Sequence, residues 1–189
     1  MAHSFRNLAP FRRRCMSSSP ATSLTLGNFA AIRVVPCPTG KALEAAASFL
    51  ASDELFRFTG ILSRENIGDR SLMVGHEAHL LSDPKDQPWV YLNHSFDPTV
   101  SLSHAPVFNA DAAPPVITAR AAIDLQPGAP LTIDYTLHEW EMFGGGFVCG
   151  ESGRPVRGFK HLTESEKEKA LPKAAAHLHE MHLNEKKCR

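Results

Sequence analysis

Near its middle the chain reads Tyr91-Leu92-Asn93-His94-Ser95-Phe96-Asp97-Pro98, and further along it reads Leu131-Thr132-Ile133-Asp134-Tyr135. In the first stretch, the polar tripeptide Asn-His-Ser directly follows an apolar, strand-like run, where a plain core strand would simply turn. The second stretch alternates in polarity and ends in one of only two tyrosines in the chain. These two stretches carry the strongest signal of fold and function in this sequence.

The overall composition is that of an ordinary globular protein. The 189 residues suit a single domain with a real core, and 43% hydrophobic with 21% charged residues is a typical balance. Lys+Arg and Asp+Glu are equal at 20 each, so net charge gives no reason to expect direct nucleic-acid binding. No apolar run approaches the roughly 20 residues that a membrane-spanning helix needs, so no membrane association is expected. Composition does not predict the oligomeric state.

The first part of the chain has a different charge pattern. Residues 1–43 contain no Asp or Glu but six basic residues, and three serines follow the arginine run at 12–14. This composition is typical of an organellar transit peptide, which predicts a disordered leader over residues 1–28 and a mitochondrial or plastid destination. The alternatives are a disordered basic leader without a targeting role, or translation starting at Met16. In those cases a cytoplasmic or nuclear location is expected.

Short strands separated by turns dominate the rest of the chain. Residues 31–35 predict a strand ended by Pro36, residues 54–60 alternate as in a half-buried strand, and residues 71–75 and 78–81 read as a hairpin. Residues 42–50 fit either a strand or a helix, because their alanines favour a helix but tertiary context often overrides that preference. Further strands are expected at 116–120 and 131–135. The pattern predicts a mainly β domain with little helix.

The tail is predicted to be helical. Thr163 and Glu166 resemble a capping box, and a charged helix is expected from there to about Lys187, interrupted or kinked at Pro172. Its histidines do not have the spacing of a helical zinc site, so we interpret His177, His179 and His182 as a solvated face.

The two opening stretches resemble the signature of the SET domain, the fold of most protein-lysine methyltransferases. The resemblance covers residues 29–162 and rests on four features in the family's order: Thr39-Gly40-Lys41-Ala42, the stretch 93–98, the stretch 131–135 after the Pro127-Gly128 turn, and a flank at 139–140, 147–150 and 158–162. It implies a SET domain at 29–140, a post-SET-like segment at 141–162 and a helical tail at 163–189. The fold that it implies is a β-clip-like arrangement of several short sheets with a knot-like crossing, followed by a C-terminal helix.

The resemblance also implies a cofactor, S-adenosylmethionine. In the family the two stretches build the cofactor cleft, which assigns Asn93 and His94 to the cofactor and places Tyr91 and Phe147 against it. Gly40 and Lys41 would line the same cleft, where close backbone approach suits glycine. On the residues alone, Asn93-His94-Ser95 also fits an Asx-type turn closing a strand, and Gly40 an ordinary turn.

Tyr135 is the candidate catalytic residue that the resemblance implies. Methyl transfer to an amine requires a neutral lysine and in-line alignment in a desolvated channel, and a tyrosine hydroxyl on a rigid side chain suits that task. The alternative is a half-buried tyrosine that only packs, with its hydroxyl in water. The expected partner is a lysine side chain of a protein or peptide substrate.

The chain departs from zinc-bearing relatives in two places. The cysteine that follows Asn-His-Ser in those relatives is Phe96 here, and the stretch 147–154 keeps only Cys149. One thiol cannot hold a structural zinc, which usually takes four ligands, so we expect no metal. Phe96 is expected to pack onto Phe147 or Phe143 instead, and the post-SET-like segment to be held by the packing of Trp140, Phe147 and Phe159.

Two other functions remain open. One is a catalytically inactive SET-like module that binds a peptide or cofactor without turnover, given the missing metal and the small number of tyrosines. The other is a structural or interaction role dominated by the tail helix. No glycine-rich phosphate cradle or dinucleotide fingerprint is present, which argues against a doubly wound methyltransferase fold.

Overall fold

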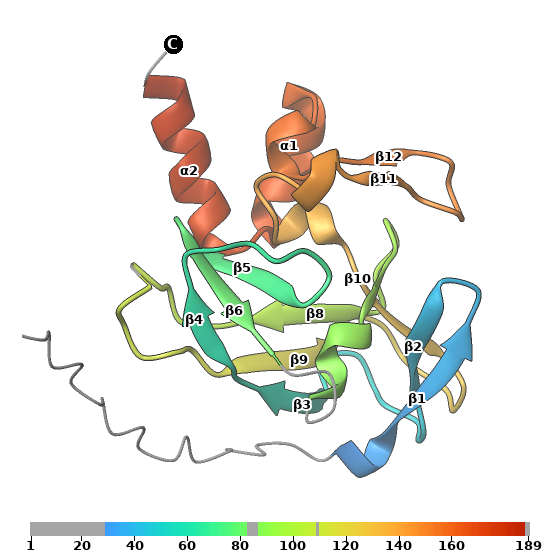
Figure 1. Ribbon diagram of the computed structural model, residues 1–189. Coiled ribbons are helices and arrows are strands. Elements are labelled where there is room, and N and C mark those ends of the chain that lie inside the picture. Colours follow the sequence, from blue (N-terminus) through green and yellow to red (C-terminus); the bar gives the residue numbers. More distant parts are fainter. Residues whose placement is uncertain (1–28, 83–86, 109, 188–189) are drawn as a thin grey trace, which may run out of the picture.

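The computed structural model describes residues 29–82, 87–108 and 110–187. These residues form several small sheets with short helical turns between them and two helices at the C-terminal end (Figure 1). The predicted leader, residues 1–28, lies outside the described residues, as do Cys15 and Cys188. Among the ranges described, no helix is both long and apolar enough to cross a membrane.

The strands are grouped into four sheets. The first has the order β1 (Ile32–Cys37), β2 (Gly40–Ala45), β10 (Pro130–Ile133), β7 (Asn93–His94). The second has the order β3 (Glu54–Phe58), β9 (Ile117–Ala121), β8 (Val100–Ser103), and the third β4 (Ile61–Ser63), β6 (Ala78–Leu81), β5 (Ser71–Gly75). A two-stranded pair joins β11 (Phe147–Val148) to β12 (Pro155–Val156). The mainly β architecture of several short sheets is therefore confirmed, and it is consistent with a SET-like β fold.

The first sheet brings the two sequence stretches together. β10 pairs antiparallel with β2 on one side and parallel with β7 on the other, with Thr132 opposite Asn93 and Ile133 opposite His94. The contact continues past the strands, because the amide of Ser95 donates to the carbonyl of Ile133 at 3.1 Å. Segments far apart in the sequence thus lie side by side, directly before Tyr135.

Two predictions made from the sequence concern the strands β1 and β2 of this sheet. Of residues 42–50, which fit either a helix or a strand, residues 42–45 form the second part of β2; Leu43 and Ala45 are fully buried there, so pairing with both neighbours overrides the helical preference of alanine. The prediction that Pro36 ends the first strand is wrong, because β1 continues to Cys37. β1 is an edge strand, and a proline without an N–H is tolerated at a sheet edge.

The core lies between the sheets. Phe56 and Phe58 are buried there, and the ring of Phe58 stacks on Trp89 at 4.8 Å between centroids. The strand expected at 54–60 forms as β3, but it does not alternate strictly: Leu55 and Phe56 are both buried, because a β-bulge shifts the register between Glu54 and Phe56. The expected hairpin of β5 and β6 is confirmed.

The C-terminal tail consists of two helices rather than one. α1 (Glu164–Ala170) begins with the predicted capping box, in which Thr163 and Glu166 exchange hydrogen bonds. A 3-10 turn, η6 (Leu171–Lys173), contains Pro172 and separates α1 from α2 (Ala176–Lys187), so the predicted interruption is confirmed. The buried Lys167 ammonium ties the two helices together through Glu164 at 3.2 Å and Glu185 at 3.8 Å.

The interpretation of the tail histidines as a solvated face is wrong for two of them. His177 and His182 are 5% and 4% exposed, because α2 packs back on the domain instead of standing in solvent. The amide of Ala175 donates to the carbonyl of Leu137 at 2.8 Å, and His177 Nε2 lies 2.8 Å from the carbonyl of His138. These two bonds anchor the start of α2 beside Tyr135.

Candidate functional site

The site is built where β7 and β10 end. Beyond Ile133 the chain turns into a 3-10 turn, η3 (Tyr135–Leu137), capped by Asp134, whose carboxylate accepts from the amide and hydroxyl of Thr136. The amide of Tyr135 donates to His94 Nδ1 at 3.2 Å, and the two rings lie 5.3 Å apart. The structure therefore places the Asn93–His94 pair directly beside Tyr135.

His94 is a neutral imidazole with one unused ring nitrogen. Because its Nδ1 accepts from the amide of Tyr135, the proton must sit on Nε2. Burial lowers the pKa of His94 to about 4. Nε2 is buried and has no hydrogen-bond partner among the described residues, although a buried donor normally has one. Nε2 can therefore still donate a hydrogen bond to an acceptor atom of a ligand.

Asn93 is tied to the turn that begins β2. Its amide nitrogen donates to the carbonyl of Lys41 at 3.1 Å, and the Lys41 ammonium lies 5.2 Å from the centre of the Tyr91 ring. Gly40 has a φ of +124°, which disfavours any other residue, and a Cβ placed there would meet nothing within 4 Å. The structure thus brings Gly40, Lys41, Tyr91 and Asn93 together at the start of β2.

The segment after Tyr135 folds back over this cluster. Phe147, at the start of β11, lies edge-on to His94 and Tyr135, at 5.8 and 6.1 Å between ring centroids. The three glycines at 144–146 all have positive φ, and a Cβ on Gly146 would collide with the carbonyl of Val156. Glycine is therefore required where the chain turns into β11.

Contacts without metal hold this segment against the Asn-His-Ser stretch. The hydroxyl of Ser95 donates to the Glu151 carboxylate at 3.1 Å, and the Arg154 guanidinium lies over the Phe96 ring at 4.1 Å. The expected packing of Phe96 on Phe147 or Phe143 is replaced, among the described residues, by this cation–π contact and by an edge-on contact with His94 at 4.5 Å.

The base of the segment is packed as expected. Trp140 stacks on the fully buried Phe159 at 5.9 Å between centroids. Residues 29–82, 87–108 and 110–187 contain no group of three or more metal-ligating side chains, and Cys37 and Cys149 are free thiols. The described part of the site therefore offers no preformed metal centre.

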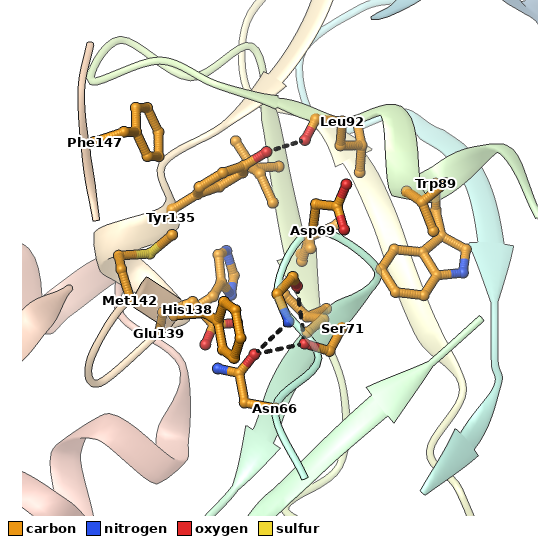
Figure 2. A pocket seen from close by; sticks show the side chains of 16 residues that line it. Asn66, Asp69, Ser71, Trp89, Leu92, Tyr135, His138, Glu139, Met142 and Phe147 are labelled. Carbon is orange, nitrogen blue, oxygen red and sulfur yellow. Dashed lines mark hydrogen bonds between the residues drawn. The ribbon is translucent and has the colours of Figure 1, made fainter. Parts of the chain in front are cut away.

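A cavity of about 240 Å³ opens beside Tyr135 (Figure 2). We call it the Tyr135 cavity. Its aromatic wall consists of Trp89, Tyr135, Phe143 and Phe147, and its polar lining includes Asn66, Asp69, Ser71, His138 and Glu139. Of the residues that the sequence assigned to the site, Tyr135 and Phe147 line this cavity, whereas Gly40, Lys41, Tyr91, Asn93 and His94 do not. Tyr135 and Phe147 contact His94 and also line the cavity. They thus separate the cavity from the polar cluster, the name used below for Gly40, Lys41, Tyr91, Asn93 and His94.

Tyr135 is a neutral phenol with a fixed direction. Its hydroxyl donates to the carbonyl of Leu92 at 2.9 Å (Figure 2). Burial, helped by the negative charges of Glu139 and Asp69, raises the pKa of Tyr135 to about 12. The side chain can therefore orient a neighbouring group by hydrogen bonding, but it cannot act as a base near neutral pH.

Sequence reasoning missed two titratable residues of the cavity. Glu139 is 7% exposed; its Oε1 accepts from the amide of Met73 at 2.8 Å, and its Oε2 is buried without a partner among the described residues. Burial raises the pKa of Glu139 to about 7 despite the Met73 amide. Burial also lowers the pKa of the neighbouring His138 to about 3, so His138 is neutral at pH 7.

One weak signal could have pointed to Glu139. It stands four residues after Tyr135, and its amide donates to the Tyr135 carbonyl at 2.8 Å, so both side chains leave the same face of one helical turn. The spacing is visible in the sequence, but the burial is not.

Comparison with known proteins gives only distant relations. No protein-family model matches the chain, and no curated protein matches it either. Among solved structures, a candidate histone methyltransferase from Plasmodium falciparum is 15% identical with a TM-score of 0.45, covering 56% of this chain and 92% of that one. The Polycomb Repressive Complex 2 of Chaetomium thermophilum matches in a humanized mutant bound to the inhibitor GSK126 and in an apo, autoinhibited state. Both are 17% identical, with TM-scores of 0.42 and 0.43, and each match covers 56% of this chain and 15% of that chain.

Likenesses at this level do not assign a family or an activity. The chain spans about a seventh of the matched Polycomb chains, 15% of their length. The chemistry of the site follows instead from the geometry of residues 93–94, 135 and 147 and of the cavity beside them.

Proposed function

We propose that this protein transfers a methyl group from S-adenosylmethionine to a lysine side chain of a protein substrate. The observation that carries the proposal is the parallel pairing of β7 with β10, which puts Asn93 and His94 on one side of Tyr135 while an aromatic cavity opens on the other. A methyl donor and an acceptor amine need two such compartments that meet at one point.

The polar cluster suits the cofactor. The Asn93 amide nitrogen donates to the Lys41 carbonyl and to the Cys37 sulfur, so its side-chain oxygen remains for a ligand. His94 Nε2 is a buried donor without a partner among the described residues, and the space beside Gly40 is open. Gly40, Lys41, Tyr91, Asn93, His94 and Phe147 would hold the cofactor, which supplies an activated methyl group when bound.

The Tyr135 cavity suits the alkyl chain and amine of a lysine. Its aromatic walls remove water from the side chain, which favours the neutral amine that methylation requires. The Tyr135 ring is held by its hydrogen bond to Leu92, so the wall at the point of transfer is rigid. The chain's contribution is alignment and desolvation, for which no covalent intermediate is needed.

The test separates binding from turnover. Titration calorimetry with S-adenosylmethionine is expected to show one binding site in wild type, and weaker binding in Asn93→Ala. Radiolabelled cofactor incubated with fractionated protein extracts is expected to label lysine with wild type, and much less with Tyr135→Phe, which keeps the ring but loses the hydroxyl. Cofactor binding without any labelled lysine would favour an inactive SET-like binding module, and the absence of cofactor binding would refute the proposal.

A further inference from the structure

The Tyr135 cavity contains a carboxylate without a counter-charge in the described part of the chain. Glu139 lines the cavity beside His138 and Met142 (Figure 2). One carboxylate oxygen accepts from the Met73 amide, and the other is shielded from solvent and has no partner within residues 29–82, 87–108 and 110–187. No ion pair joins Glu139 to a cation among the described residues, and the adjacent His138 is neutral at pH 7.

A half-satisfied buried carboxyl group costs stability. A charged carboxylate in an apolar site must gain a proton, a hydrogen bond or a positive partner. Burial raises the pKa of Glu139 to about 7, so at neutral pH it is divided between its two forms. The Met73 amide of β5 needs an acceptor at this place, but a neutral glutamine would supply an oxygen without the cost of a charge, so this hydrogen bond does not require an acid.

A ligand of one chemical class satisfies this arrangement. The aromatic walls accept an alkyl chain, and an ammonium group at its end would give Glu139 Oε2 both a donor and a charge partner. A neutral alkyl group would leave the carboxylate unpaired, and an anion would be repelled by the buried Glu139.

We propose that Glu139 is the counter-ion of a primary alkylammonium bound in the Tyr135 cavity, and that its carboxylate takes up the proton that the amine must lose before methylation. The second half of this inference rests on the proposed function; the first half does not. Glu139 then stands on the same helical turn as Tyr135, with the phenol and the carboxylate on one wall around the amine.

The step balances in charge and atoms. The ammonium gives one proton to the Glu139 carboxylate, which leaves a neutral amine and a neutral carboxylic acid. The amine lone pair then forms the new N–C bond as the donor's S–C bond breaks and its electron pair stays on sulfur. The sulfonium charge passes to the methylated nitrogen, and the proton on Glu139 passes to water before the next turnover. A carboxyl group that titrates near neutrality suits this exchange.

Binding of two small probes tests the counter-ion directly. n-Butylammonium and its neutral isostere 1-butanol are titrated into the full chain by NMR at pH 6 and pH 8. Wild type is expected to prefer the ammonium, and the preference to grow towards pH 8 as Glu139 loses its proton. Glu139→Gln keeps an oxygen for the Met73 amide. This variant is expected to bind the ammonium roughly tenfold more weakly than wild type, and its affinity is expected not to depend on pH.

Asp69→Asn is the matched control. Asp69 lines the same cavity, but its side chain is 92% exposed, so water screens its charge and the ammonium affinity is expected to change less than about twofold. Equal affinity of wild type and Glu139→Gln, a preference of wild type that is independent of pH, or no ammonium binding at all would each overturn the counter-ion. The pH dependence in wild type decides the question even if the variant does not fold.

A methylation assay separates this inference from the proposed function. If the probes behave as expected but no lysine is labelled at any pH, the counter-ion stands and the proposed function fails. If wild type labels lysine and Glu139→Gln labels it at the same rate with the same pH profile, the methyltransferase stands and Glu139 is not the proton acceptor. Loss of labelling towards low pH in wild type, with a lower and flatter profile in the variant, supports both.

Discussion

Lowering the pH should destabilise this protein mainly through three buried histidines. His94, His138 and His177 are neutral in the fold because burial lowers their pKa values to about 4, about 3 and about 4. The hydrogen bonds of two of them favour the neutral ring: His94 Nδ1 accepts from a backbone amide, and His177 donates from Nε2 while its Nδ1 is buried without a partner among the described residues. A second proton on either of these two rings would meet no acceptor there.

The sign and size of this destabilisation follow from the difference in proton uptake between the unfolded and the folded chain. Below pH 6.5 the unfolded chain binds protons on these three histidines that the fold refuses, so stability is present above that pH and is lost as the pH falls towards 4. Each proton is worth about 1.4 kcal/mol per pH unit. Glu139 acts in the opposite direction, because its raised pKa lets the fold keep a proton between pH 7 and 4.5 that the unfolded chain releases. The three histidines each lower the stability and Glu139 raises it, so the net loss is about 2 kcal/mol between pH 6 and pH 5.

Other titratable groups lie in the same region and change the net loss of stability. The pKa values of His79 on β6 and of His104 after β8 are also lowered by burial, which adds to the loss on acidification. Burial raises the pKa of Asp134, which opposes the loss at lower pH. The His104 and His177 rings stack at 6.1 Å, so charging both at once would add repulsion where α2 docks.

The assay is urea unfolding at half-unit steps from pH 7 to pH 5. His177→Gln keeps an amide donor for the His138 carbonyl but cannot be protonated, so its stability should fall by about 1 kcal/mol less than that of wild type over the same unit. His76→Gln, at an exposed histidine in the β5–β6 turn, is the matched control and should follow wild type. Stability that is constant or rises as the pH falls, or equal slopes for wild type and His177→Gln, would refute the reasoning.

Three further substitutions test the framework around the site. Phe159→Ala should cost about 3–5 kcal/mol in urea unfolding, because Phe159 is fully buried under Trp140, whereas Phe108→Ala, at a side chain that is 79% exposed, should cost little. Gly146→Ala should expose residues 147–156 to proteolysis, because its Cβ would meet the Val156 carbonyl; Gly128→Ala, with a similar φ of +87° and open space, controls for backbone strain alone. Thr163→Ala should cost about 1 kcal/mol by removing the capping box of α1, read by thermal unfolding.

The adjacency at the centre of the site was predicted from the resemblance of the two stretches to the SET signature, because residue types alone also fitted an Asx-type turn and a tyrosine that only packs. The structure brings the two stretches together in the pairing of β7 with β10. The capping box and the break at Pro172 were predictable from the residues themselves, since both act within a few residues of the chain.

What the sequence did not reveal depends on tertiary packing. Residues 40–45 become a strand because β1 and β10 lie on both sides of them, not because of their own preference. His177 and His182 look like part of a polar helix face until α2 folds back, and Glu139 looks like any surface acid before a tryptophan. In each case the deciding quantity is burial, which comes from contacts distant in the sequence.

Burial also gives the cavity its electrostatic character. Tyr135 keeps its proton because its pKa is raised to about 12, and His94 and His138 stay neutral because their pKa values are lowered to about 4 and about 3. Glu139, with a pKa of about 7, is then the buried group at this place whose charge changes near neutrality. The exclusion of water from the cavity makes a bound amine easier to deprotonate, and it also leaves Glu139 able to receive the proton. Binding of the ammonium and its deprotonation therefore follow from one property of the cavity, its low water content.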